Sequence, residues 1–221
     1  VDTLHNKLKE YEASYETILF LSKLGFQTKD SMIIYNYYKD RTKQVIDQDI
    51  YQLIYDINDI TFKKIDQIAL KMGIEKDALI RIKAALIYIM NEVSNTYGHS
   101  YYYQEELITL LPRVLMTIPS QETYDQALLD LIKDSRIVQK AEKLYLKDMY
   151  DAETLIVKRL RLLENNPGQS SPLVDETIKD LEDFYQITYN KEQKQAIKES
   201  YEKDFLIITG GPGTGKTTIM Q

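Results

Sequence analysis

The chain has 221 residues, of which 43% are hydrophobic and 28% charged, a balance typical of a folded globular protein rather than a disordered one. Its formal net charge of −6 argues against a strongly basic nucleic-acid clamp, and the absence of cysteine excludes disulfides and thiolate metal sites. No apolar stretch approaches the roughly 18 residues of a membrane span, and no signal-peptide pattern opens the sequence, so we expect a cytoplasmic protein without a membrane partner.

Short helices dominate the first hundred residues. Apolar residues at helical spacing predict helices over residues 4–24, 29–38, 41–46, 49–56, 61–72 and 77–95. Gly25 and Gly73 follow two of them as expected C-caps, and Asp77 is the expected N-cap of the last. So many short helices in this length predict stacked helix-hairpin-helix units over residues 1–97 rather than a bundle.

Two of the predicted hairpins are candidates for DNA contact. Such hairpins bind DNA when a glycine-rich turn directs backbone N–H groups at a phosphate and nearby lysines add charge. Gly25 lies in the first turn, and Lys63 with Lys64 follows the second. Asp59 and Thr61 occupy positions of the second hairpin where glycines are expected, and the Asp59 carboxylate would repel a phosphate. The alternative is a packing unit with a solvated lysine face.

Residues 98–150 change character and predict a small winged-helix-like α+β module. Two helices, 104–111 and 123–133, precede strands at 136–139 and 143–146, and Thr123 with Gln126 forms the expected capping box of the second helix. The run Tyr101–Tyr103 could stack on bases, but half-buried structural tyrosines are the favoured interpretation. His5 and His99 have no neighbours at ligand spacing, so no metal site is expected at either histidine.

A helical linker region is expected over residues 151–187. It consists of a helix over 151–163, a turn-rich linker over 165–172 and an amphipathic helix. The apolar face of that amphipathic helix carries Val174, Ile178, Leu181 and Phe184.

The sequence Gly210-Gly211-Pro212-Gly213-Thr214-Gly215-Lys216-Thr217 fits the G-x-x-x-x-G-K-[ST] phosphate-binding loop. A buried strand is expected over 205–208 before it and a helix from Lys216 after it. Backbone N–H groups at a helix N-terminus would hold the phosphates of ATP, Lys216 would reach the β- and γ-phosphates, and the Thr217 hydroxyl would bind Mg²⁺. The expected nucleotide-binding residues are Gln193, Gly211, Pro212, Gly213, Thr214, Gly215, Lys216, Thr217 and Thr218. The alternative is a glycine-rich turn without a ligand.

A complete motor needs more than this loop. Hydrolysis requires an acidic metal ligand, a group that positions water and usually an arginine at the transferring phosphate. One strand and a short helix also cannot bury both faces of a doubly wound sheet. We therefore expect residues 188–221 to be the truncated start of an α/β P-loop domain. On this expectation the chain is an internal piece of a longer protein and has neither ATPase nor unwinding activity alone.

The order of these elements resembles the RecD-type helicases of superfamily one, in the long RecD/TraA-like form with an N-terminal extension. The resemblance is carried by ITGGPGTGKTT at 208–218, by IYDINDITFKKIDQIALKMGI at 54–74 and by the Gly98–Tyr101 turn. It implies an ATP-driven 5′ to 3′ DNA helicase of DNA repair, acting on single-stranded or forked DNA beside partner proteins of the repair machinery. In this likeness Lys216 and Thr217 are the catalytic residues.

The resemblance also implies that Gln193 recognises the adenine edge. A capping box between Asn190 and Gln193 at a helix start is the competing role for this side chain. For the whole chain, two alternatives remain: the extension is a protein-interaction arm of a motor, or the protein is another kind of P-loop ATPase with a helical DNA-binding extension.

Overall fold

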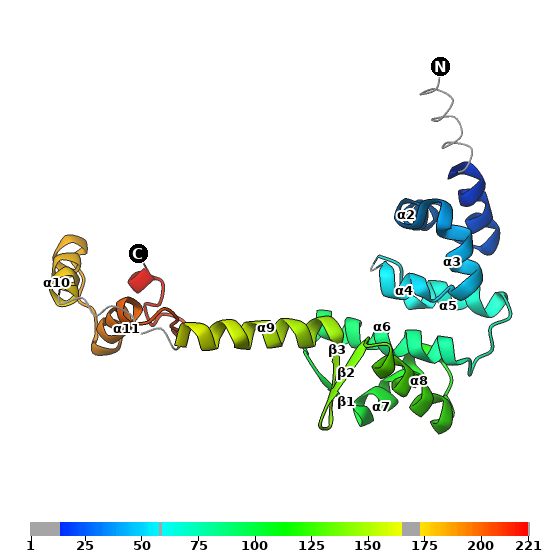
Figure 1. The fold of residues 1–221 in the computed structure, drawn as a ribbon. Helices are drawn as coiled ribbons and strands as arrows, with labels where there is room; N and C mark the ends of the chain where they lie inside the picture. The colour runs from blue at the N-terminus through cyan, green and yellow to red at the C-terminus, as the bar shows by residue number, and fades with distance from the viewer. Residues whose placement is uncertain (1–13, 58, 165–172, 221) are drawn as a thin grey trace, which may run out of the picture. The chain divides into compact units, whose positions relative to one another are not determined.

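The structure, a computed structural model, describes residues 14–57, 59–164 and 173–220, which form two compact units, 1–150 and 151–221. The first unit holds a helix over residues 14–24, α2 (Thr28–Tyr38), η1 (Lys39–Arg41), α3 (Thr42–Asp49), α4 (Gln52–Asp56), α5 (Phe62–Lys71), α6 (Leu79–Tyr97), β1 (Tyr102–Tyr103), α7 (Gln104–Leu115), α8 (Gln121–Lys133), β2 (Ile137–Lys140) and β3 (Lys143–Leu146) (Figure 1). Helix α9 (Lys147–Glu164) begins in the first unit and continues into the second, which also holds α10 (Val174–Tyr185), α11 (Lys191–Glu202) and η2 (Thr218–Met220).

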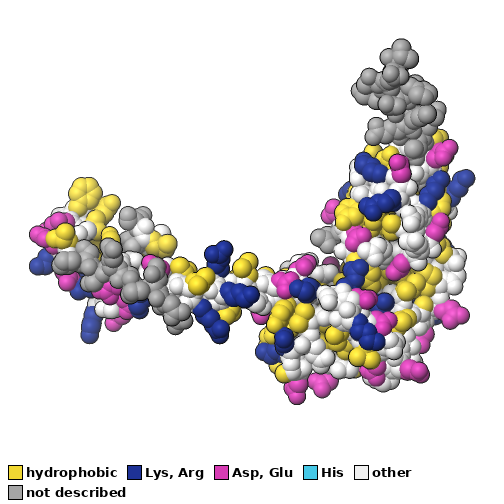
Figure 2. Space-filling view, in the orientation of Figure 1, with side chains coloured by type: hydrophobic (Ala, Val, Ile, Leu, Met, Phe, Trp, Pro, Cys, Tyr) yellow, Lys and Arg dark blue, Asp and Glu magenta, His cyan; other side chains and the backbone are white. Residues whose placement is uncertain are grey.

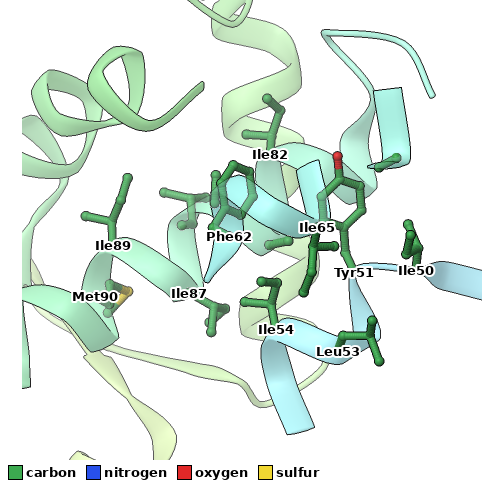
Figure 3. Close-up of a cluster of buried hydrophobic side chains, with 14 of the residues drawn as sticks. Ile50, Tyr51, Leu53, Ile54, Phe62, Ile65, Ile82, Ile87, Ile89 and Met90 are labelled. Atoms are coloured by element: carbon green, nitrogen blue, oxygen red, sulfur yellow. The ribbon is translucent and has the colours of Figure 1, made fainter. Parts of the chain in front are cut away.

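Helix α6 is the centre of the first unit. It contacts α4 and α5 of the helical hairpins as well as α7, α8 and β3 of the following module (Figure 1). Figure 3 shows its side chains Ile82 and Ile87 beside those of α4 and α5. Within this cluster the ring of Phe62 packs on both Tyr51 and Tyr88, with centroids 5.9 and 5.7 Å away. One continuous hydrophobic core therefore joins the hairpins to residues 98–150.

Glycines end two helices as predicted. Gly25 has φ of 108° and Gly73 has φ of 94°. After the first helix the N–H of Gly25 donates to the Ser22 carbonyl and that of Phe26 to the Leu21 carbonyl, at 3.0 and 3.1 Å. The same pair of bonds follows α5, so both C-caps have the Schellman pattern. The positive φ explains why glycine is needed at these ends.

Two predicted N-caps are wrong. Helix α6 begins at Leu79 after Ala78, with no side-chain cap, and α8 is capped by the Ser120 hydroxyl rather than by Thr123. The Asp77 carboxylate instead accepts from the Ser120 N–H at 3.2 Å and from the Thr123 hydroxyl at 2.8 Å. Asp77 therefore does not cap its own helix. It bonds to Ser120, 43 residues later in the chain, and so links the start of α8 to the start of α6.

The two predicted strands form and a third joins them. β2 and β3 pair antiparallel, and β1 pairs on the other side of β3 to give the order β1-β3-β2. Tyr102 of β1 is buried and its hydroxyl donates to the Met90 carbonyl of α6, while Tyr101 and Tyr103 are half-buried. The structural interpretation of the tyrosine run is therefore confirmed at Tyr102. The winged-helix-like description stays a prediction.

The second unit has a small core. Val174, Ile178 and Tyr189 are buried, and Leu181 packs against them. The prediction that Phe184 belongs to the apolar face of α10 is wrong, because its side chain lies at the edge of that face and is 78% exposed. The linker over 165–172 and the early part of the first predicted helix lie outside the described residues. In the part of the chain that the structure describes, no helix is long and apolar enough to cross a bilayer.

The strand predicted at 205–208 is wrong, since residues 205–210 have no regular secondary structure. A strand needs ladder partners for its backbone groups, and the described residues of this unit supply none to this segment. Phe205 and Ile207 are consequently 41% and 69% exposed. The helix predicted from Lys216 is a single 3-10 turn, η2.

The buried tyrosines predict loss of stability in alkali. Burial raises the pKa of the phenols of Tyr38, Tyr51, Tyr55, Tyr102 and Tyr124, that of Tyr102 to about 12. Because these values lie above the usual value near 10, the unfolded chain releases its phenolic protons first. The stabilisation is complete below about pH 10 and is lost as the pH rises toward 12.

An absorbance titration at 295 nm, followed beside helical circular dichroism, measures this. The buried phenols are expected to ionise only as the helical signal falls. Ionisation of all tyrosines in one step near pH 10, with unchanged ellipticity, would contradict this.

Candidate functional site

The first predicted DNA-contacting turn places Gly25 beside α5. A Cβ atom at Gly25 would meet the Ile68 side chain at 3.8 Å, an ordinary contact. The backbone angle, not lack of space, therefore demands glycine here. The turn joins the helix over 14–24 to α2, so the first hairpin has the local geometry that the sequence predicts.

The second hairpin connects α4 to α5. Ile60 is 3% exposed and anchors the connection in the core, whereas Asp59 and Thr61 face solvent. Thr61 precedes α5 without a side-chain cap, and Lys63 and Lys64 lie in the first turn of that helix. Asp59 is thus exposed near the position where a phosphate would approach.

The structure separates the roles of the two lysines. The Lys64 ammonium forms an ion pair with Asp30 of α2 at 3.0 Å, and the Asp30 side chain is only 6% exposed. Lys64 therefore links the two hairpins. Lys63 is exposed and forms no ion pair with any described residue. Of the two, Lys63 has the charge that is free to meet DNA.

Asp66, three residues after Lys63 on α5, forms a buried ion pair with Arg81. The Arg81 guanidinium meets the Asp66 carboxylate in two parallel bonds of 2.7 and 2.8 Å, and the Tyr51 hydroxyl donates to the same carboxylate at 2.6 Å. The remaining Arg81 donors reach the carbonyls of Lys76 and Leu115 and the Thr117 hydroxyl. Burial alone would lower the Arg81 pKa, but the bonds and charge of Asp66 outweigh burial and raise it.

Sequence reasoning missed this network. Asp66 stands on the apolar stripe of α5, between Ile65 and Ala69, and a carboxylate at such a position signals a buried partner. That signal could have been found. Its partner Arg81 lies 15 residues away, and only the packing of α5 on α6 brings the two together.

The candidate phosphate-binding loop is compact, with Lys216 folded over it. The Lys216 ammonium donates to the carbonyls of Gly210 and Gly211, at 2.5 and 2.8 Å. Gly213 and Gly215 have φ of 77° and 78°. A Cβ at Gly215 would come within 2.3 Å of the Gln193 amide nitrogen, the movable end of a flexible side chain, so the positive φ rather than lack of space favours glycine here.

The other predicted residues of the loop are mostly exposed. Thr214 turns its hydroxyl to the Gly211 carbonyl at 2.9 Å, whereas Pro212, Thr217 and Thr218 face solvent. The glycines and Lys216 are the residues that would hold a triphosphate, and the Thr217 hydroxyl would supply one position of a Mg²⁺ shell completed by phosphate oxygens and water. In the described part of the chain, no group of three or more His, Cys, Asp or Glu could hold a metal ion.

Gln193 connects α11 to this loop. Its side-chain oxygen accepts from the Asn190 N–H at 2.9 Å, and the Asn190 side chain accepts from the Gln193 N–H at 2.8 Å. The predicted capping box is therefore confirmed. The amide nitrogen of the same side chain donates to the Thr214 carbonyl at 3.1 Å, a contact that sequence reasoning missed. Recognition of adenine by Gln193 stays a prediction.

Helix α10 holds the start of α11. The Glu182 carboxylate accepts from Lys194 at 2.9 Å and from the Tyr189 N–H at 2.7 Å. These two bonds lower the pKa of Glu182. The contact is therefore retained above the ordinary pKa of a glutamate and is lost as the pH falls through the lowered value.

The first unit carries two helical hairpins, one formed by the helix over 14–24 with α2 and the other by α4 with α5. Residues 10–101 match the family model described as the ATP-dependent RecD2 DNA helicase HHH domain. The match covers less than half of the chain and supports an N-terminal region of RecD2 helicase type. It agrees with the resemblance inferred from the sequence of this segment, while the nucleotide-binding role of the loop at 210–217 stays a prediction.

Basic and acidic side chains are mixed over the visible face of the first unit (Figure 2). Residues 20–92 contain 11 Lys and Arg against 10 Asp and Glu. A DNA contact by this unit would therefore depend on where individual cations are placed rather than on a uniformly basic surface.

Proposed function

We propose that the chain is the N-terminal part of an ATP-dependent 5′ to 3′ DNA helicase of RecD type that acts in DNA repair. Residues 14–150 handle DNA, and residues 188–221 begin the nucleotide-binding domain. The observation that carries the proposal is the match of residues 10–101 to the HHH domain of a RecD2 DNA helicase, on the same chain as the phosphate-binding motif of 210–217.

In this function the loop binds ATP with Mg²⁺. Lys216 neutralises the β- and γ-phosphates and Thr217 is a metal ligand. Lys216 would exchange its bonds to the carbonyls of Gly210 and Gly211 for phosphate oxygens, which are stronger acceptors because they are charged. Gln193 lies against the same loop, so a nucleotide seated there is within reach of a side chain suited to an adenine edge.

Fluorescence anisotropy with labelled single-stranded and forked DNA over a salt series tests the DNA-handling role. We expect binding by the 221-residue chain that weakens with salt, with a logarithmic slope of about −0.7 to −0.9 for each neutralised phosphate. No binding at low salt would contradict a DNA-handling arm and favour a protein-interaction arm. For the motor, the full-length protein is expected to unwind a 5′-tailed duplex with ATP and to leave a 3′-tailed duplex intact.

A further inference from the structure

A cavity of about 430 Å³ opens beside the second hairpin. Its lining includes Lys63 and Gln67 of α5, Lys76 of the connection to α6, Tyr88 of α6, and Arg113 and Met116 at the end of α7. The volume lies within the roughly 300–1,000 Å³ of small-ligand pockets. All of these residues belong to the first unit, so the cavity is formed within it.

Positive charge gathers around this cavity. Lys63, Lys76 and Arg113 are exposed, and none of them forms an ion pair among the residues that the structure describes. The acidic residue of the lining, Asp66, is neutralised by Arg81. The cavity thus offers three free cations from three segments in a chain whose net charge is −6. An anion is the ligand that this arrangement favours.

The rest of the lining is apolar and aromatic. Phe62 is 1% exposed and packs against the half-buried ring of Tyr88, and Leu70 and Val114 line the same space. Met116 is 84% exposed and forms part of the lining. Cations beside an aromatic and aliphatic surface fit a ligand with an anionic end and a flat apolar end. A nucleotide has this chemistry, with its phosphate and its base.

We propose that this cavity binds one nucleotide of a single DNA strand, with the phosphate at Lys63, Lys76 and Arg113 and the base against Tyr88 and Met116. The inference rests on the proposed function, because it names where the helical hairpins hold the strand. Lys64 is excluded from the contact, since it is paired with Asp30. A free nucleotide has the same chemistry, so the test separates the two sources.

The test is anisotropy of a labelled oligothymidylate with the 221-residue chain carrying Lys216→Ala, which removes the phosphate loop's lysine. Lys63→Ala, Lys76→Ala and Arg113→Ala are each expected to weaken binding about tenfold, the effect of one charge-assisted contact. Each is also expected to reduce the salt slope by about 0.7. Lys71→Ala is the matched control, because Lys71 is an exposed lysine of α5 outside the cavity lining and should leave both quantities unchanged.

The outcomes separate the two proposals. If the Lys216→Ala chain binds the oligonucleotide and the three further variants bind it equally well, the cavity is not the site and the DNA-handling role stands without it. If the chain binds no DNA at all, the DNA-handling role fails and the inference fails with it. If the variants no longer bind thymidine monophosphate but still bind the oligonucleotide, the cavity binds a free nucleotide and the strand proposal is overturned.

Discussion

Replacing Arg81 with methionine is expected to lower the free energy of unfolding of the first unit by about 3–5 kcal/mol. The substitution keeps much of the apolar volume but removes every N–H donor that faces Asp66. The carboxylate would then remain buried with the Tyr51 hydroxyl as its described hydrogen-bond donor. The carbonyls of Lys76 and Leu115 would lose the Arg81 donor as well, which leaves Leu115 with the longer bond from the Thr117 hydroxyl. Urea unfolding followed by helical circular dichroism measures the loss.

Lys83→Met is the matched control on the same helix. Lys83 lies 3.9 Å from the Asp130 carboxylate and 3.8 Å from that of Asp134, longer contacts than those of Arg81. We expect this variant to lose less than about 1 kcal/mol, as for a partly exposed pair. An equal fall in the free energy of unfolding from the two substitutions would show that the Asp66–Arg81 network stabilises the core no more than a partly exposed ion pair does.

The second large effect is expected at the phosphate loop. Lys216→Ala should reduce ATP turnover by the full-length protein by about 10²–10³-fold, the cost of removing one preorganised charge at the transferring phosphate. Structure at the loop should survive, because Gln193 still holds the Thr214 carbonyl and Thr214 still bonds to Gly211.

Lys203→Ala serves as the control for this measurement. Lys203 forms an exposed ion pair with Glu199 of α11 at 2.7 Å and takes no part in the loop's hydrogen bonds. ATP turnover should be unchanged by that substitution. Undiminished turnover by Lys216→Ala would remove the loop from the proposed catalytic machinery.

Local sequence patterns predicted most of the elements and failed where distant residues compete. Gly25 and Gly73 end helices as expected, because positive φ is a property of a single residue. Asp77 could not be placed from its neighbours, since its partners Ser120 and Thr123 come from a later helix. β1 was missed because two residues become a strand only through pairing with β3.

The candidate sites divide along the same line. The motif at 210–217 could be recognised from residue spacing alone, whereas the strand before it requires partner strands that the described residues do not supply. Lys63 and Lys64 are neighbours in sequence with identical chemistry, and nothing local distinguishes them. Asp30, 34 residues before Lys64, decides that one is paired and the other free.

The central position of α6 has a consequence for dissection of the protein. One side of the helix is covered by the hairpins and another by α7, α8 and β3. The Asp77 carboxylate also accepts a hydrogen bond from the start of α8. Ending the polypeptide at residue 97 would uncover apolar side chains along its longest buried helix and leave the Asp77 carboxylate without its partners. The hairpins alone are therefore a poor choice for an isolated domain, and the smallest fragment of the first unit that we expect to fold independently extends through residue 150.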